Sequence, residues 1–204
     1  MRKLDSRLGE TRVELVTATF VASGRPEGVH DFGRLLENLN NPTLFGCVEL
    51  HQATVRPLYS GGDPLVLDVP LLVRRDDVIF AAFEGPYFPR GLVRPPQVEV
   101  PVLLLTPPFQ VRGAVAMQPG VDCTQALRNI VRGFFAVRDA QVLDSDGAPL
   151  GEGEQIAVNG ALVQMYGATG RHIGVAAESA TPERREAALE VVQPDGGAGI
   201  SRAA

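Results

Sequence analysis

Histidine and cysteine are the side chains best suited to chemistry, and this chain has few of them. Histidines stand at positions 30, 51 and 172, without the helical spacing of an H-E-x-x-H zinc motif. Cys47 and Cys123 form no C-x-x-C pair. Cys47 and His51 are roughly 13 Å apart along a strand, too far for a cysteine–histidine nucleophile. With no G-x-S-x-G motif or P-loop either, the sequence predicts no enzyme, no metal site and no cofactor.

One glycine-rich stretch, residues 167–174, has the composition of an anion-binding loop. Backbone N–H groups at such glycines can cradle a phosphate, here with Gly170, Arg171 and His172 as the contact residues. The stretch follows a predicted strand but opens no convincing helix. We therefore expect a flexible exit from the last strand and keep these three residues only as a candidate anion loop.

Composition limits the partners that this chain can have. It has 204 residues, 45% of them hydrophobic, and a net charge of −5. No window approaches 18 uninterrupted apolar residues, and the charged start of the chain has no apolar core behind it. We expect a cytoplasmic protein with no membrane partner. Arginines are dispersed and Lys3 is the only lysine, so a nucleic-acid surface is not favoured.

The chain repeats one pattern of residues. Residues 29–39 match residues 120–130 at an offset of 91, residues 48–55 match 135–142 at an offset of 87, and residues 72–79 match 156–163 at an offset of 84. The offset changes only at predicted turns, which is what a duplicated structural unit should show.

Each predicted unit has a strand, a helix and three further strands. Residues 13–21 and 109–115 alternate as strands do, Asp31 and Asp122 stand where a helix N-cap belongs, and Asn159-Gly160 predicts a two-residue hairpin turn. The predicted fold class is α+β, mostly β, with two repeated small β-barrel-like units related by a pseudo-two-fold axis. The expected boundaries are 10–83 for the first unit, 84–97 for a proline-rich connector, 98–168 for the second unit, and 169–204 for a loop, a short helix at 181–192 and a flexible tail.

The second unit resembles a small β-domain of uncharacterised bacterial proteins. The residues that carry the resemblance are Phe109–Gly113, the F-x-x-V-x-D-A-x-V pattern at Phe134–Val142, and the V-A-V-N-like run Ile156–Asn159. The first unit departs from this pattern, with His51-Gln52 in place of Arg138-Asp139. The architecture is also loosely similar to that of Sm-like barrels, although the helix of those barrels precedes all the strands. The resemblance implies a tandem copy of this domain but no activity.

Short sheets with exposed edges favour a function in binding. Such edges are covered by a sister unit, a connector or another chain. We therefore expect a non-enzymatic binding or assembly protein, a homo-oligomer or the partner of another protein, that docks through sheet edges and the connector residues Tyr87, Phe88 and Leu92. The alternative is an Sm-like RNA-binding protein that contacts nucleic acid through His51 and Arg138.

Overall fold

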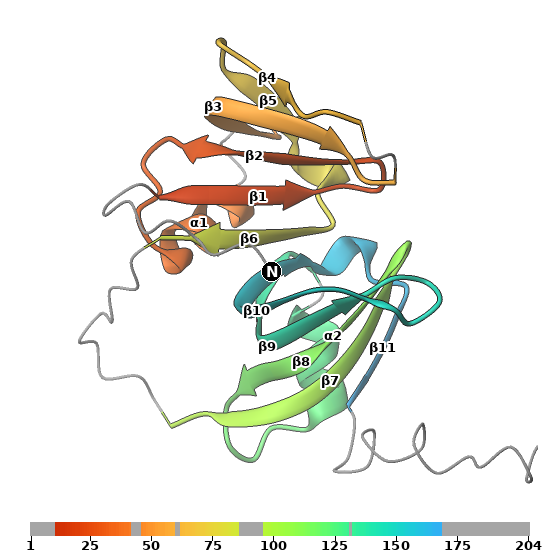
Figure 1. Cartoon of the computed structure of the whole chain (residues 1–204). Coiled ribbons are helices and arrows are strands. Elements are labelled where there is room, and N and C mark those ends of the chain that lie inside the picture. The colour runs from red at the N-terminus through yellow and green to blue at the C-terminus, as the bar shows by residue number, and fades with distance from the viewer. Residues whose placement is uncertain (1–10, 42–45, 60–61, 86–95, 131, 169–204) are drawn as a thin grey trace, which may run out of the picture. The chain divides into compact units, whose positions relative to one another are not determined.

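The computed structural model describes residues 11–41, 46–59, 62–85, 96–130 and 132–168. Its strands all belong to one antiparallel sheet (Figure 1). The strands are β1 (Arg12–Val16), β2 (Phe20–Pro26), β3 (Cys47–Pro57), β4 (Leu65–Val66), β5 (Leu71–Arg74), β6 (Phe80–Glu84), β7 (Val98–Thr106), β8 (Phe109–Met117), β9 (Phe134–Leu143), β10 (Pro149–Asn159) and β11 (Met165–Ala168). The helices are α1 (Phe32–Asn40) and α2 (Cys123–Ile130), and two 3-10 turns are η1 (Arg75–Asp77) and η2 (Gly160–Leu162).

The strand order across the sheet is β11-β7-β8-β9-β10-β6-β1-β2-β3-β4, and β5 pairs with β3 beside β4. Among the described residues the sheet is open, with β11 at one end and β4 and β5 at the other. The prediction of two separate barrel-like units is therefore wrong, while the prediction of a mostly β fold is confirmed. The reason lies at β6 and β10: the edges that would have closed each unit pair with each other instead, in the register Ala81 to Ala157.

Residues 11–85 form the first segment of the chain and residues 96–168 form the second segment. Both segments have the same element order: two strands, a helix, further strands, a 3-10 turn and a last strand. The prediction of a single strand before the first helix is wrong, because the chain turns after Val16. The hydroxyl of Thr17 accepts hydrogen bonds from the N–H groups of Thr19 and Phe20, and this bonding holds a tight turn between β1 and β2.

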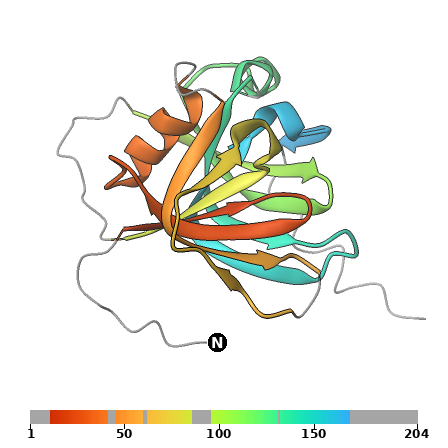
Figure 2. The same cartoon turned by 90° about the horizontal axis from the view of Figure 1, so that it is seen from above.

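Both helices begin where their N-caps were predicted. The carboxylate of Asp31 accepts the Arg34 N–H at 2.7 Å, and Asp122 accepts the Gln125 N–H at 2.8 Å. These bonds satisfy backbone donors that the first helical turn leaves unpaired. The helix α1 also contacts β9 of the second segment (Figure 2).

The predicted hairpin at Asn159-Gly160 is not formed. Asn159 instead ends β10, and its side chain accepts the Ala161 N–H to cap η2. The strands on either side of this turn therefore separate, with β10 pairing with β9 and β6, and β11 pairing with β7. The chain turns here without the positive φ that the predicted two-residue hairpin turn would have required.

Two hydrophobic clusters form the core. One cluster gathers mostly second-segment residues and includes Phe80, Ile156 and Val158, while the other gathers mostly first-segment residues and includes Ala81 and Ala157. Neighbouring residues of a strand point to opposite faces of the sheet. At the β6–β10 junction the two clusters therefore lie on opposite faces, and each segment contributes side chains to the core of the other.

Candidate interaction surface

The junction of β6 and β10 shows how a strand edge of the first segment and one of the second cover each other. Three residues of β10 pair with three of β6: Ile156 with Ala82, Ala157 with Ala81 and Val158 with Phe80. The Asn159 N–H extends the pairing by donating to the Ile79 carbonyl at 2.9 Å. The junction is thus a short antiparallel ladder between alanine, aliphatic and aromatic side chains.

Two asparagines add side-chain hydrogen bonds across this junction. The Asn159 side chain is buried and donates to the Val78 carbonyl at 3.0 Å. At the end of α1, Asn40 accepts the Phe134 N–H and donates to the Phe134 carbonyl, both at 2.8 Å. These bonds occupy backbone groups that would otherwise lie unpaired beside the core.

The two segments share details of geometry as well as element order. A β-bulge in β3 opposite Gly24 of β2 matches one in β9 opposite Gly113 of β8. Each bulge contains a residue other than glycine with positive φ, Gln52 at 49° and Asp139 at 46° respectively. Each such residue marks the same place in its strand, so positions of β3 and β9 can be matched by counting from it.

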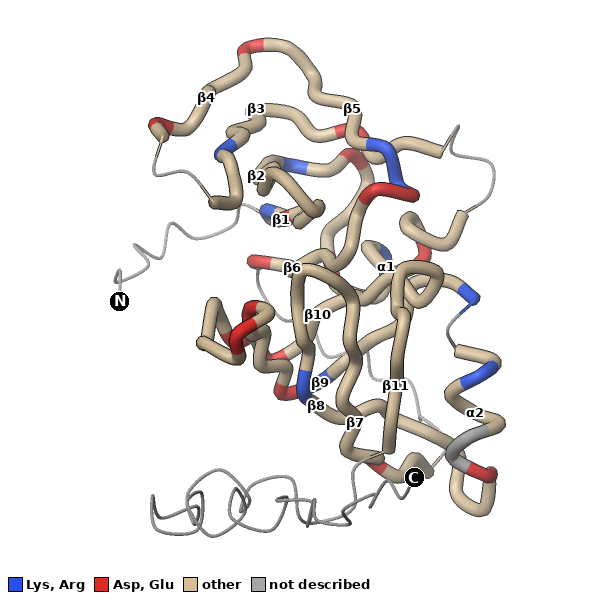
Figure 3. Tube along the Cα trace, turned by 90° about the vertical axis from the view of Figure 1, so that its right-hand side faces the viewer, with Lys and Arg blue, Asp and Glu red and all other residues tan. Residues whose placement is uncertain are grey.

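At the two ends of the sheet, the strands have no partner on their outer side within the described chain. Of the ten large apolar side chains that are exposed in the described chain, six lie on these end strands or in the link between β4 and β5. The six are Leu65, Val66, Val69, Leu72, Met165 and Tyr166. No charged residue lies on β11, and β5 carries a single one, Arg74 (Figure 3). Unpaired apolar edges without charge are the kind that accept another strand.

Beside β5 lies a hollow of about 520 Å³. Its lining includes Cys47 and Glu49 of β3, Leu72 of β5 and Asn38 of α1. Leu72 pairs with Glu49 in the sheet, so the hollow begins directly at the free edge. An apolar side chain of an added strand would have room to enter there.

A second hollow, of about 590 Å³, lies over β8, β9 and β10. Its charged lining residues are Arg112, Asp139, Glu152 and Glu154. Across the described part of the chain, no group of three His, Cys, Asp or Glu side chains is arranged to hold a metal ion. The lining of this hollow is therefore of mixed charge, without a group arranged to hold a metal ion among the described residues.

Most of the residues predicted to form a site lie outside the described residues. This holds for the connector residues Tyr87, Phe88 and Leu92, for the anion-loop residues Gly170, Arg171 and His172, and for the helix expected at 181–192. These predictions stay predictions.

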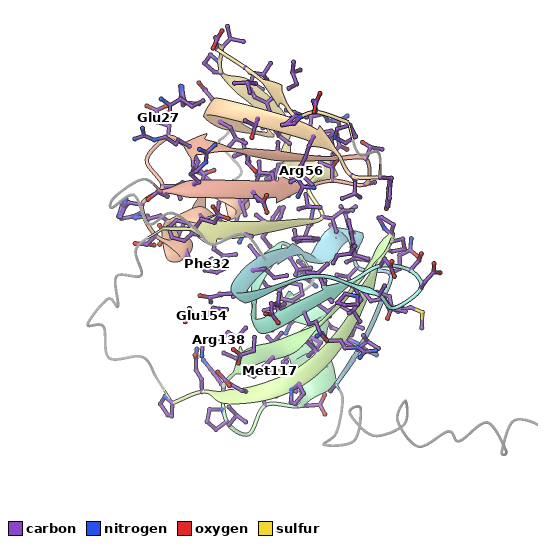
Figure 4. All side chains as sticks on the ribbon, in the orientation of Figure 1. Glu27, Phe32, Arg56, Met117, Arg138 and Glu154 are labelled. Carbon is purple, nitrogen blue, oxygen red and sulfur yellow. The ribbon has the colours of Figure 1, made fainter. Side chains whose placement is uncertain are left out.

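The two predicted nucleic-acid contacts occupy matching places in the two segments. His51 precedes Gln52, and Arg138 (labelled in Figure 4) precedes Asp139. Four strands separate β3 from β9 in the sheet, so the two side chains do not form one patch along it. Each lies near a carboxylate: His51 Nε2 is 3.3 Å from Glu49, and an Arg138 guanidinium nitrogen is 2.8 Å from Glu99. A carboxylate beside each of these side chains weakens the attraction of that side chain for a phosphate.

Sequence reasoning missed the residues of the free edges, above all Leu72, Met165 and Tyr166. The available signal was weak: the run Met165–Ala168 lacks charge but is too short to show alternation. The run Leu71–Val73 is apolar like the paired strands, and nothing in it indicates that one side of the strand is free. Only the strand order identifies these residues as edge residues.

Neither helix of the described residues is long and apolar enough to cross a membrane. The resemblance to a bacterial small β-domain stays a prediction, since nothing further bears on it. Comparison of the chain with models of protein families, with curated proteins and with solved structures found no match.

Proposed function

We propose that this chain is a non-enzymatic assembly protein that associates by adding strands to the free edges of its sheet. The observation that carries the proposal is the concentration of exposed apolar side chains at the two ends of the sheet, represented by Leu72 of β5 and Met165 of β11. In water such side chains cost free energy, roughly 25 cal/mol for each Å² of apolar surface that remains exposed. Covering them with another strand would also pair the free backbone groups of the edge.

The charge pattern of the edges supports binding by strands. Edges that must remain unpaired are commonly protected by lysine, by proline or by inward-pointing charges. The sequence Met-Tyr-Gly-Ala of β11 contains none of these. The connector residues Tyr87 and Phe88 belong to the same proposal as a second contact, because their aromatic side chains would cover apolar area in a complex.

The test is the mass of the full chain in solution, measured by size-exclusion chromatography with light scattering. We expect a defined oligomer for the wild type and a single-chain mass for the variant Leu72→Lys/Met165→Lys. A lysine ammonium buried without a partner would oppose strand pairing at either edge. The matched control is Val121→Lys, because Val121 is also an exposed apolar residue but lies in the turn before α2, and this variant should keep the wild-type mass.

A wild-type protein with the mass of one chain would overturn the proposal, as would an oligomer that the edge lysines leave intact. Absorbance at 260 and 280 nm is recorded in the same run, with and without RNase. Co-purifying RNA that RNase removes would replace the proposal with the Sm-like alternative. For the connector, Tyr87→Ser/Phe88→Ser should reduce association, and an unchanged mass would exclude these two residues from the contact.

A further inference from the structure

We infer that the partner at each free edge is a second copy of this chain, with β5 of one copy pairing with β11 of the next. The inference rests on the proposed function and names its partner. Its template is the β6–β10 junction inside the chain, where the last strand of the first segment pairs with the strand before the 3-10 turn of the second. In the opposite combination these are β11 and β5, and each of them has one outer side without a partner strand among the described residues.

The match of β5 to β10 follows from their pairing with the corresponding strands β3 and β9. Leu72 pairs with Glu49, three residues before the positive-φ residue Gln52. Ala157 pairs with Ala136, three residues before the positive-φ residue Asp139. Leu72 and Ala157 therefore occupy the same place in the two segments, and the match of Leu72 with Ile156 predicted from the sequence is wrong by one residue.

The match of β11 to β6 follows in the same way. Ala81 pairs with Leu15, two residues before the buried Thr17 at the end of β1. Tyr166 pairs with Leu104, two residues before the buried Thr106 at the end of β7. Tyr166 is therefore the counterpart of Ala81.

The register of the contact can now be transferred from the junction. Ala157 pairs with Ala81 inside the chain, so Leu72 of one copy should pair with Tyr166 of the next. One step along the ladder, the pair Val158–Phe80 transfers to Val73 with Met165.

The free positions of β5 and β11 are far more exposed than the matching positions of the β6–β10 junction, so a partner strand has apolar surface to cover there. Ala157 and Phe80 at the junction have 0% and 8% of their surface exposed, whereas Leu72 and Met165 at the matching free positions both have 63% exposed. The apolar character of these positions is thus explained by a strand that covers them.

The hollow beside β5 matches a filled region of the junction. Cys47 and Leu72 line the hollow, and their counterparts Phe134 and Ala157 belong to the core cluster of the first segment. Because directly opposed residues of a sheet share a face, Tyr166 of the second copy would lie on the hollow side of β5. Its ring supplies the apolar volume that the hollow lacks.

Because β5 and β11 are different surfaces, the contact is heterologous. Each copy that joins still offers one free β5 or one free β11, so association continues until a ring closes or a chain of copies grows. Both forms contain the same pair, Leu72 with Tyr166, and that pair is what the experiment detects.

The experiment is disulfide trapping in the full-length chain. Cys47→Ser and Cys123→Ser remove the native thiols, and Leu72→Cys and Tyr166→Cys are then made separately in this background. Under mild oxidation an equal mixture of the two should give a band at twice the chain mass, lost on reduction. Each variant alone should stay at the single-chain mass, since the introduced thiol of one copy would not meet the same thiol of another copy.

Ala168→Cys replaces Tyr166→Cys in the control mixture. Position 168 lies two residues from position 166, on the same strand and the same face. The yield of cross-linked product in this mixture should be at least roughly fivefold lower, because disulfides need Cα atoms within about 7 Å. The wild-type mass in solution confirms that each cysteine variant still assembles.

The outcomes separate the two proposals. Cross-linking of Leu72→Cys with itself, or of Tyr166→Cys with itself, would overturn the β5–β11 pairing while leaving assembly through edges in place. An oligomer that the edge lysines dissociate but the mixture does not cross-link would have the same consequence. A wild-type chain that is a monomer would overturn both.

Discussion

In the second segment β10 runs from Pro149 to Asn159 without a break, whereas in the first segment the matching part of the chain is divided into β4 and β5. The far end of β10 pairs with β6 and is buried there, and the matching end of β5 faces no strand among the described residues. Each end has three successive apolar residues, Leu71–Val73 in β5 and Ile156–Val158 in β10. Pairing, and not the apolar character of these residues, therefore decides which of the two edges is buried.

The turns that begin the two segments differ as well. In the first, the Thr17 hydroxyl accepts two backbone N–H groups, including that of Phe20, and donates to the Phe20 carbonyl. In the second, Pro107 and Pro108 follow the matching Thr106, whose hydroxyl has no hydrogen-bond partner although it is buried. Proline has no N–H to donate. The same threonine position thus stabilises one turn by hydrogen bonds and leaves the other to proline's restricted backbone.

Matching positions of the two segments can be compared through the free energy of unfolding of single-residue variants. Urea unfolding is followed by far-UV circular dichroism, because the chain has no tryptophan. All variants are compared at one protein concentration, since self-association would make stability depend on concentration.

The largest effect is expected at the glycines opposite the two bulges. A Cβ at Gly113 would lie 2.6 Å from the Arg138 carbonyl oxygen, and a Cβ at Gly24 would lie 2.9 Å from the Leu50 Cβ. Gly113→Ala should therefore destabilise by about 3 kcal/mol and Gly24→Ala by about 2 kcal/mol, as overpacking does. Gly151→Ala on β10 meets no atom within 4 Å and should cost less than about 1 kcal/mol. Equal urea midpoints for the three variants would show that both glycine positions opposite the bulges tolerate a side chain.

The next effect concerns the junction. Asn159→Ala removes the donor to the Val78 carbonyl and the acceptor of the Ala161 N–H, and should cost about 2 kcal/mol, because buried backbone groups lose their partners. The matching residue Arg74 is exposed, with Asp77 at 3.7 Å, so Arg74→Ala should change stability by less than about 0.5 kcal/mol. A similar loss of stability for both variants would contradict the expectation that the side chain at the paired edge contributes more than the one at the free edge.

A smaller effect is expected at the helix N-caps. Asp31 is buried and Asp122 is exposed, although both accept a first-turn N–H. Asp31→Ala should cost about 1–2 kcal/mol and Asp122→Ala about 0.5–1 kcal/mol. The same urea series measures both, with Asp→Asn at each position as the control, since asparagine also caps. If Asp122→Ala proved the more harmful, the ranking by burial would be wrong.

The smallest effect is expected for an exposed ion pair. Glu99→Gln removes the carboxylate 2.8 Å from the Arg138 guanidinium, and both side chains are partly exposed. The cost should be about 0.5 kcal/mol or less, and it should fall as salt is added, because salt screens exposed charges. Unfolding in low and high salt measures it. A loss that salt leaves unchanged would indicate a packing role for Glu99.

Much of the local structure could be predicted from short stretches of sequence. Asp31 and Asp122 cap helices because a carboxylate reaches the free N–H groups two or three residues later. The alternation in Phe135–Val142 predicts a strand because successive side chains point to opposite faces. These signals act within one turn of helix or a few residues of strand, so the sequence alone carries them.

The candidate site could not be predicted in this way. The connector and loop residues chosen from the sequence were picked for their type, and they lie outside the described residues. Leu72 and Tyr166 drew no attention, because nothing in their neighbouring residues says that one side of their strand is free. Asn159-Gly160 predicted a hairpin by its local preference, and tertiary pairing of β10 with β6 overrode that preference.

A mostly β chain, two helix caps and apolar strands all follow from short stretches of the sequence. Which strand edges meet, and therefore which apolar residues are covered, depends on tertiary contacts. Every strand carries the same backbone donors and acceptors, so its hydrogen bonds do not depend on side-chain identity. The choice between closing two small units and joining one open sheet rests on contacts between residues 80–82 and 156–158, far apart in the chain.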